Sequence, residues 1–199
     1  MKLKPVAILF DMDGVLVDSL DSWWISLNHS LENFNYKPLT RVEFIKKYWG
    51  HDLYDNLQTM NIPEKVGHFC NNVYSTHINN IHIYSETKKT LEKLQNYRKT
   101  IITNTPKDCT VQILKRFEIN NYFEFILTSD DVSMAKPDPE IVLKSCELLK
   151  VKPEEVVLVG DTNSDVQAGH KAGCLVIGIN IEADYTIKNI SEITDIIKI

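Results

Sequence analysis

Almost continuously hydrophobic segments recur along this chain, at residues 6–10, 100–103, 125–127, 156–159 and 175–179. A strand with one face in water alternates apolar and polar residues, whereas a strand buried on both faces is apolar throughout. The pattern therefore predicts a central sheet of buried parallel strands.

Amphipathic segments after these strands have the spacing of helices. They predict helices over 106–117 and 139–149, and a third over 164–172 that ends at Gly173. The expected N-cap residues of the first two are Thr105 and Asp138, each followed by a proline at the first helical position, Pro106 and Pro139. Strands alternating with helices indicate an α/β fold with a doubly wound, parallel, Rossmann-like sheet.

The long segment between the first two predicted strands has only helical patterns. A helix over 21–34 has one apolar face, a capping-box pair at Thr40 and Glu43 starts a short helix that closes at Gly50, another helix follows Asp52, and a longer one covers 66–81. We therefore predict an all-helical cap domain, residues 18–84, inserted into an α/β core domain of residues 1–17 and 85–199. The aromatic residues Trp23, Trp24, Tyr48 and Trp49 are expected mainly to pack within this cap.

Composition and charge exclude several classes of protein. With 199 residues, 43% of them hydrophobic, the chain can bury a large core, and a net charge of −5 argues against a nucleic-acid partner. No apolar run approaches the roughly 20 residues of a membrane span, so we expect no membrane association and a cytoplasmic protein. The four cysteines, Cys70, Cys109, Cys146 and Cys174, are too scattered for a zinc site and are expected to be buried thiols.

Polar residues that could act in catalysis or ligand binding follow four of the predicted strands or start the helices after them. They are Asp11 and Asp13, Thr103 and Asn104, Lys136, and Asp161 and Asp165. The carboxyl ends of parallel strands are where this architecture places an active site. Each piece alone is more commonly a turn or a helix cap, but their joint occurrence in this order favours a catalytic site.

The carboxylates of this group require a positive partner. Two like charges about 4 Å apart repel by about 4 kcal/mol at an effective dielectric constant near 20. A set of oxygen ligands suits Mg²⁺ better than Zn²⁺. With a lysine and a helix N-terminus added, the site could also hold a phosphoryl group bridged to the metal.

The motifs "DMDGVLVDS", "TN", "KPDPE" and "GDTNSDVQAG" resemble, in this order, the four motifs of the haloacid dehalogenase superfamily. A helical insertion after the first motif is similar to the subgroup that contains phosphoglycolate phosphatases and β-phosphoglucomutases. The resemblance covers nearly the whole chain. It is specific for the superfamily and uninformative about the substrate.

The resemblance implies a role for each motif residue. Asp11 would be the nucleophile and a metal ligand, and Asp13 would be the general acid and base, with its backbone carbonyl on Mg²⁺. Thr103, the backbone of Asn104 and Lys136 would bind the phosphoryl group. Asp161 would complete the metal shell, and Asp165 would support the metal or Lys136.

The function expected from this resemblance is a Mg²⁺-dependent phosphatase for a small phosphorylated metabolite, similar to phosphoglycolate phosphatases, acting through an aspartyl phosphate as a monomer or homodimer. A phosphomutase of the β-phosphoglucomutase type has identical motifs and stays open as the alternative. A pyrophosphatase, a dehalogenase and a catalytically silent binding protein are less favoured. Substrate choice is expected in the cap, where the candidates are Arg41, Lys46, Lys47 and His51.

Overall fold

The computed structural model describes residues 2–199 and contains a six-stranded sheet in which all neighbouring strands are parallel. In spatial order the strands are β5 (Phe125–Leu127), β4 (Arg98–Ile102), β1 (Ala7–Phe10), β6 (Val156–Gly160), β7 (Leu175–Ile179) and β8 (Tyr185–Ile187). Strand β1 lies between β4 and β6, and its last residue, Phe10, pairs with Ile101 on one side and Val159 on the other. The predicted polar segments therefore leave the sheet at one edge.

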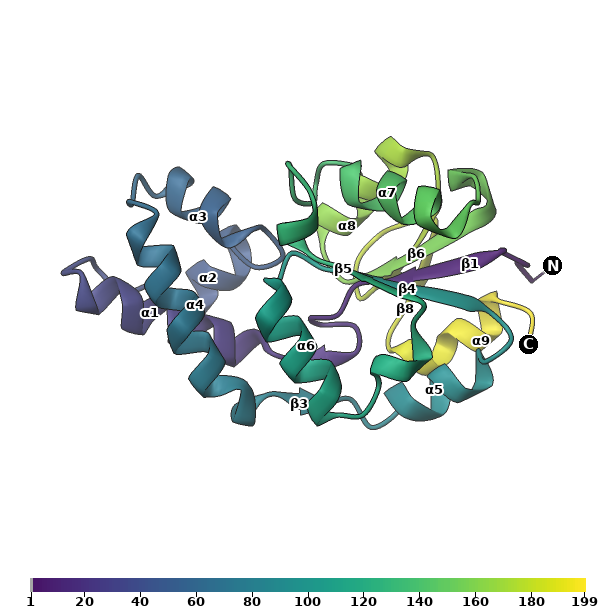
Figure 1. Cartoon of the computed structure of the whole chain (residues 1–199), viewed down its shortest axis with the longest axis horizontal. Helices are drawn as coiled ribbons and strands as arrows, with labels where there is room; N and C mark the ends of the chain where they lie inside the picture. Colours follow the sequence, from purple (N-terminus) through teal and green to yellow (C-terminus); the bar gives the residue numbers. More distant parts are fainter. Residues whose placement is uncertain (1) are drawn as a thin grey trace.

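Helices cover both faces of the sheet (Figure 1). They are α5 (Thr87–Lys93), α6 (Lys107–Arg116) and α9 (Ile193–Ile196) on one face, and α7 (Glu140–Leu149) and α8 (Asn163–Ala172) on the other. Alternation along β1 explains the two layers, since Ile8 and Phe10 pack against the first group while Ala7 and Leu9 pack against the second. The predicted doubly wound parallel fold is confirmed.

Four further helices lie beyond the carboxyl edge of the sheet, at the left of Figure 1. They are α1 (Leu20–Asn33), α2 (Arg41–Lys47), α3 (Leu53–Thr59) and α4 (Lys65–His77), and they share a separate apolar core. The Thr40–Glu43 capping box is present, and the Asp52 side chain accepts the N–H groups of Tyr54 and Asp55. Local sequence signals thus start α2 and α3.

A short antiparallel ribbon connects these helices to the core. Strand β2 (Val17–Asp18) pairs with β3 (His82–Ile83), so Val17 lies opposite Ile83. The ribbon coincides with the boundaries predicted for the cap, residues 18 and 84. The division into two domains remains a prediction, which this arrangement supports.

Some predicted boundaries were wrong. Helices α6 and α7 begin one residue later than predicted, because Pro106 and Pro139 are the N-cap residues and not the first helical ones. Pro106 has an extended ψ of 151°, and Asp138, although one position earlier, still accepts the N–H of Glu140. Helix α4 ends at His77 and continues as a 3₁₀ turn over Ile78–Asn80.

Two further findings concern the cysteines and the lengths of the helices. All four cysteines are free and buried, as predicted. Within residues 2–199, no helix has the length and apolar character required to cross a membrane.

Candidate active site

Asp11 stands directly after β1, at the centre of the carboxyl edge. Its Oδ1 accepts the N–H of Met12 at 2.7 Å and lies 3.0 Å from Nζ of Lys136. Burial raises the pKa of Asp11 well above its usual value; Lys136 opposes the shift, whereas Asp165, Asp161 and Asp13 add to it. The carboxylate is thus held in one orientation, in surroundings short of positive charge.

Lys136 is completely enclosed between two aspartates. Its Nζ lies 2.6 Å from Oδ1 of Asp165 and 3.0 Å from Asp11, and it donates a third bond to the carbonyl of Ile102 at 3.1 Å. Burial acts to lower the pKa of Lys136, but the two carboxylates outweigh it and raise the pKa. The lysine is therefore a permanent cation beside Asp11.

Three hydroxyl groups surround the Asp13 carboxylate. Thr105 donates to Oδ2 at 2.7 Å and Thr103 at 3.3 Å, while Ser19 donates to Oδ1 through a very short bond. Burial raises the pKa of Asp13, and the hydroxyls of Ser19 and Thr105 oppose that shift. These opposing effects suit a group that must both give and take a proton.

The contacts of two of these hydroxyl residues with Asp13 were not predicted from the sequence. It predicts Thr105 only as an N-cap, yet the Thr105 hydroxyl binds Asp13, and it predicts no role for Ser19. Ser19 ends the "DMDGVLVDS" motif and Thr105 follows "TN" by one residue. Their nearness to two motifs was the available signal.

Asp161 follows β6, the strand beside β1, and its carboxylate lies near that of Asp11. Burial and the neighbouring Asp165 raise the pKa of Asp161 to about 7. The indole N–H of Trp49 donates to Oδ2 at 3.2 Å, whereas Oδ1 is buried without a hydrogen-bond partner among residues 2–199. Gly14 makes the approach possible, because a Cβ at this residue would lie 2.0 Å from Oδ2 of Asp161.

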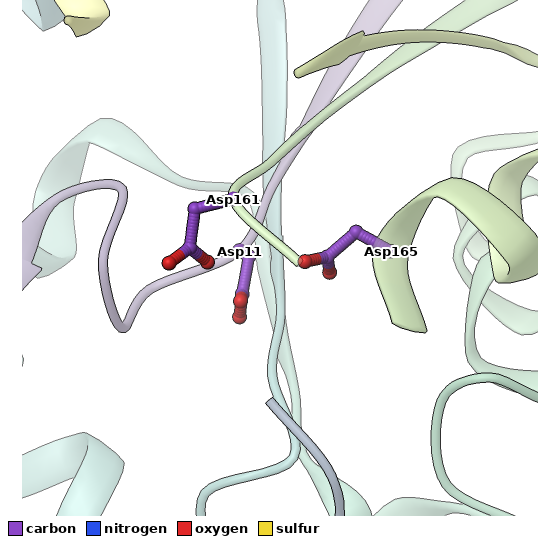
Figure 2. A group of neighbouring side chains, drawn as sticks. All are labelled: Asp11, Asp161 and Asp165. Atoms are coloured by element: carbon purple, nitrogen blue, oxygen red, sulfur yellow. The ribbon is translucent and has the colours of Figure 1, made fainter. Parts of the chain in front are cut away.

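Asp165 lies in the first turn of α8 and is fully buried. Figure 2 shows its carboxylate near those of Asp11 and Asp161, and one oxygen from each of the three can be chosen so that all lie within 4.8 Å of one another. However, Oδ2 of Asp165 accepts the Thr162 hydroxyl at 2.6 Å, and Oδ1 binds Lys136. The arrangement makes Asp165 a support for Lys136 and leaves Asp11 and Asp161 as the more available ligands.

The Asn104 side chain joins three segments. Its amide nitrogen donates to the carbonyl oxygens of Gly50 at 3.3 Å and Lys136 at 2.9 Å, and its Oδ1 accepts the N–H of Lys136 at 3.0 Å. The side chain is fully used for these contacts. Binding of a phosphate oxygen at this position would therefore fall to the backbone N–H, which is the role that the family resemblance implies for Asn104.

A cavity separates these core residues from the cap helices. Its volume is about 50 Å³. Asp11, Asp13, Lys136 and Asp161 line the core side.

The four predicted specificity residues do not lie together. His51 lines the cavity, and its Nδ1 lies 3.3 Å from the hydroxyl of Ser164. Arg41, Lys46 and Lys47 are exposed and absent from the lining, and Nε of Arg41 pairs with Asp21 at 2.6 Å. Helix α2 buries Phe44 toward the cap core, which points its charged residues outward.

The order of these motifs and this geometry agree with one family. The model of the haloacid dehalogenase-like hydrolases matches residues 8–179. The chain belongs to this family. It is therefore a haloacid dehalogenase-like hydrolase, and the resemblance seen in the sequence is confirmed.

Individual relatives of this hydrolase carry more specific names. The pyrophosphatase PpaX of Bacillus mycoides is 28% identical over 98% of both chains. A predicted phosphoglycolate phosphatase from Haemophilus somnus is 24% identical, covers 98% of both chains and has a TM-score of 0.80. CbbY from Rhodobacter sphaeroides, solved in complex with phosphate, is 18% identical, with 94% and 96% coverage and a TM-score of 0.84. The two structures show a shared fold.

Proposed function

We propose that this hydrolase is a Mg²⁺-dependent phosphatase that acts on a small phosphorylated substrate through an aspartyl phosphate on Asp11. One observation carries the proposal: a buried carboxylate beside a buried lysine faces a small cavity, and a second carboxylate held by three hydroxyls lines the same cavity. A nucleophile, a charge-neutralising cation and a proton carrier are the parts that phosphoryl transfer through a covalent intermediate needs.

The residues present fit a hard divalent cation. Oδ1 of Asp161 is buried without a partner among residues 2–199, and burial beside other carboxylates raises the pKa values of Asp11 and Asp161. Oxygen donors with excess negative charge favour Mg²⁺. Asp11, Asp161 and the backbone carbonyl of Asp13 would hold the ion, with Asp165 behind them. When bound, the metal would offset the negative charge of the transferring phosphoryl group.

In the first step, an oxygen of Asp11 forms a bond to phosphorus while the bond from phosphorus to the leaving oxygen breaks. Asp13 gives its proton to that leaving oxygen. The ammonium group of Lys136, 3.0 Å from Asp11, reduces the repulsion between the carboxylate and its anionic target. The products of this step are a neutral alcohol and a phosphorylated Asp11.

In the second step, Asp13 removes a proton from a water molecule, and the resulting hydroxide attacks phosphorus. The acyl phosphate bond breaks, which frees inorganic phosphate and restores the Asp11 carboxylate. Thr103 and the Asn104 backbone would hold the phosphate oxygens. Cap closure would exclude bulk water, so that only the water molecule beside Asp13 reacts.

A pyrophosphatase is the second candidate, because a relative that is 28% identical over 98% of both chains carries that name. Its reaction uses the same steps with phosphate as the leaving group. A phosphomutase would transfer the phosphoryl group back to a sugar instead of water. Cytoplasmic location and a monomeric or dimeric state remain predictions from the sequence.

The decisive experiment measures phosphate release from a panel of phosphate esters and pyrophosphate, with and without Mg²⁺. The quenched wild type is expected to gain the mass of one phosphoryl group, and Asp11→Asn is expected to abolish both this mass increase and turnover. Asp21→Asn serves as the control, because Asp21 is exposed and pairs with Arg41 outside the cavity. Unchanged phosphate release by Asp11→Asn would refute the proposal, and isomerisation of a sugar phosphate without phosphate release would establish a mutase.

A further inference from the structure

The wall that the cap contributes to the cavity is mainly apolar. Trp23 and Leu27 come from α1, Phe44 from α2, Trp49 from the following loop and Leu53 from α3. Trp23 is fixed in place by stacking on Tyr74, with ring centroids 3.8 Å apart. In the mechanism above, the phosphoryl group occupies the core side, so the leaving group must contact this wall.

Among the described lining residues, the permanent positive charge lies on the core side of the cavity. Among the described residues that line it, Lys136 is the only lysine or arginine, and its ammonium group is already bound to Asp11 and Asp165. The polar side chains on the cap side are those of Tyr48, His51 and Asn56. One amide N–H of Asn56 is used by the Tyr48 carbonyl at 2.9 Å.

This distribution bears on the chemistry of the substrate. A carboxylate or second phosphate enclosed against the cap wall would lose its hydration without gaining a lysine or arginine in exchange, which is unfavourable; the ionisable group on that side is the imidazole of His51. An apolar or aromatic group at the same position gains from leaving water. The wall therefore selects against a charged leaving group.

We propose that the leaving group of the natural substrate is a small uncharged alcohol whose carbon body packs on Trp23, Trp49 and their aliphatic neighbours. The inference rests on the proposed phosphatase function and narrows its substrate class. It differs from the names of the relatives, since both phosphoglycolate and pyrophosphate carry negative charge on the leaving side.

Two esters of equal size separate charge from shape. Isobutyl phosphate and phosphoglycolate differ only in that an isopropyl group replaces the carboxylate. With the full-length enzyme and Mg²⁺, kcat/KM is expected to be at least tenfold higher for isobutyl phosphate than for phosphoglycolate, and higher than for pyrophosphate. Equal or better turnover of either charged substrate would overturn the inference while leaving the phosphatase proposal intact. If the enzyme hydrolyses neither the esters nor pyrophosphate, the phosphatase proposal itself is refuted.

A charge added to the wall provides a second test. Tyr48→Arg places a cation at the cavity and is expected to shift the kcat/KM ratio of the two esters about tenfold toward phosphoglycolate. Tyr36→Arg is the matched control, because Tyr36 is a half-buried cap tyrosine outside the cavity. An unchanged ratio in a folded Tyr48→Arg enzyme, or an equal shift in both variants, would count against the inference. The wild-type comparison stands even if Tyr48→Arg fails to fold.

Discussion

Asp13 illustrates how single side chains set the chemistry of this site. Its carboxylate is buried, which favours the protonated form, yet hydroxyls from Ser19, Thr103 and Thr105 donate to it and favour the ionised form. Under the proposed mechanism Asp13 gives a proton in one step and takes one in the next. Hydroxyl donors that offset burial keep both forms accessible.

Thr105→Val tests this balance, since valine has nearly the same shape and lacks the donor. Loss of a hydrogen bond that stabilises the carboxylate raises the pKa of Asp13 further. The alkaline limb of the pH profile of kcat/KM is therefore expected to move to higher pH, and kcat to fall about tenfold, the equivalent of one hydrogen bond of ~1.4 kcal/mol.

Thr105→Ser keeps the hydroxyl and is the control for lost packing. It is expected to restore the wild-type pH profile. A valine variant with lowered kcat and an unmoved alkaline limb would show that Thr105 acts only through packing.

The core carboxylates and Lys136 could be predicted from the sequence, because their positions after apolar strands or at helix starts can be read directly along the chain. Ser19 lies only six positions from Asp13, and its role was missed although it belongs to the same motif. The partners Thr105 and Trp49 were not predicted, because each meets its aspartate only after distant segments fold together. Trp49 and Asp161, for example, are 112 positions apart in the chain. Contacts of this kind leave no local pattern.

At the scale of elements, the turn between α2 and α3 brings the cap down onto the core. Gly50 has a φ of +81°, and a Cβ there would lie 2.4 Å from Cγ2 of Thr162, the residue before α8. Its carbonyl also accepts a bond from Asn104. A glycine thus permits both the turn and the close approach.

Gly50→Ala is expected to lower kcat/KM at least tenfold, because the added methyl group prevents the turn from reaching Thr162. Gly173→Ala separates this clash from backbone strain, since Gly173 also has a positive φ, +91°, but a methyl group added there would meet no atom within 4 Å. Both variants should lose about 1–2 kcal/mol of stability in thermal unfolding. Equal kcat/KM for the two enzymes would contradict a role of this contact in catalysis.

Elements with strong local signals were predicted well, and weakly patterned ones were not. The capping box at Thr40 and the stop at Gly173 mark their helices directly. Helix α5, strand β8 and the β2–β3 ribbon had no predicted counterpart. The ribbon contains only two residues on each side, so its pairing depends on the fold that surrounds it.

At the scale of the whole molecule, the cluster of carboxylates opposes folding when no cation is bound. Burial and Asp165 raise the pKa of Asp161 to about 7, well above its value of about 3.9 in an unfolded chain. The folded state therefore binds this proton more tightly than the unfolded state does. The resulting stability is fully present below about pH 4 and is lost as the pH rises to about 7.

We therefore expect the Tm of the metal-free enzyme, measured in EDTA, to fall between about pH 5 and pH 8. Asp11 and Asp13, whose pKa values burial also raises, act in the same direction. Saturating Mg²⁺ should reduce the fall, because the ionised carboxylates then gain a cation.

Asp161→Asn has no titrating group at this position, and its Tm in EDTA should depend less on pH over the same range. Calorimetry of both proteins with and without Mg²⁺ makes the comparison. A wild-type slope equal to that of the variant would show that Asp161 titrates normally.

The β2–β3 ribbon gives the molecule a modular construction. Because Val17 and Ile83 are paired, the chain leaves the core and returns to it at points only about 5 Å apart. A two-residue turn spans that gap. If helices α1–α4 form the separate cap that the sequence predicts, we expect that they can be excised or replaced by an insertion of another length without changing the order of strands in the sheet. Under the proposals made above, the catalytic residues belong to the core, whereas the choice of leaving group depends on helices α1–α4.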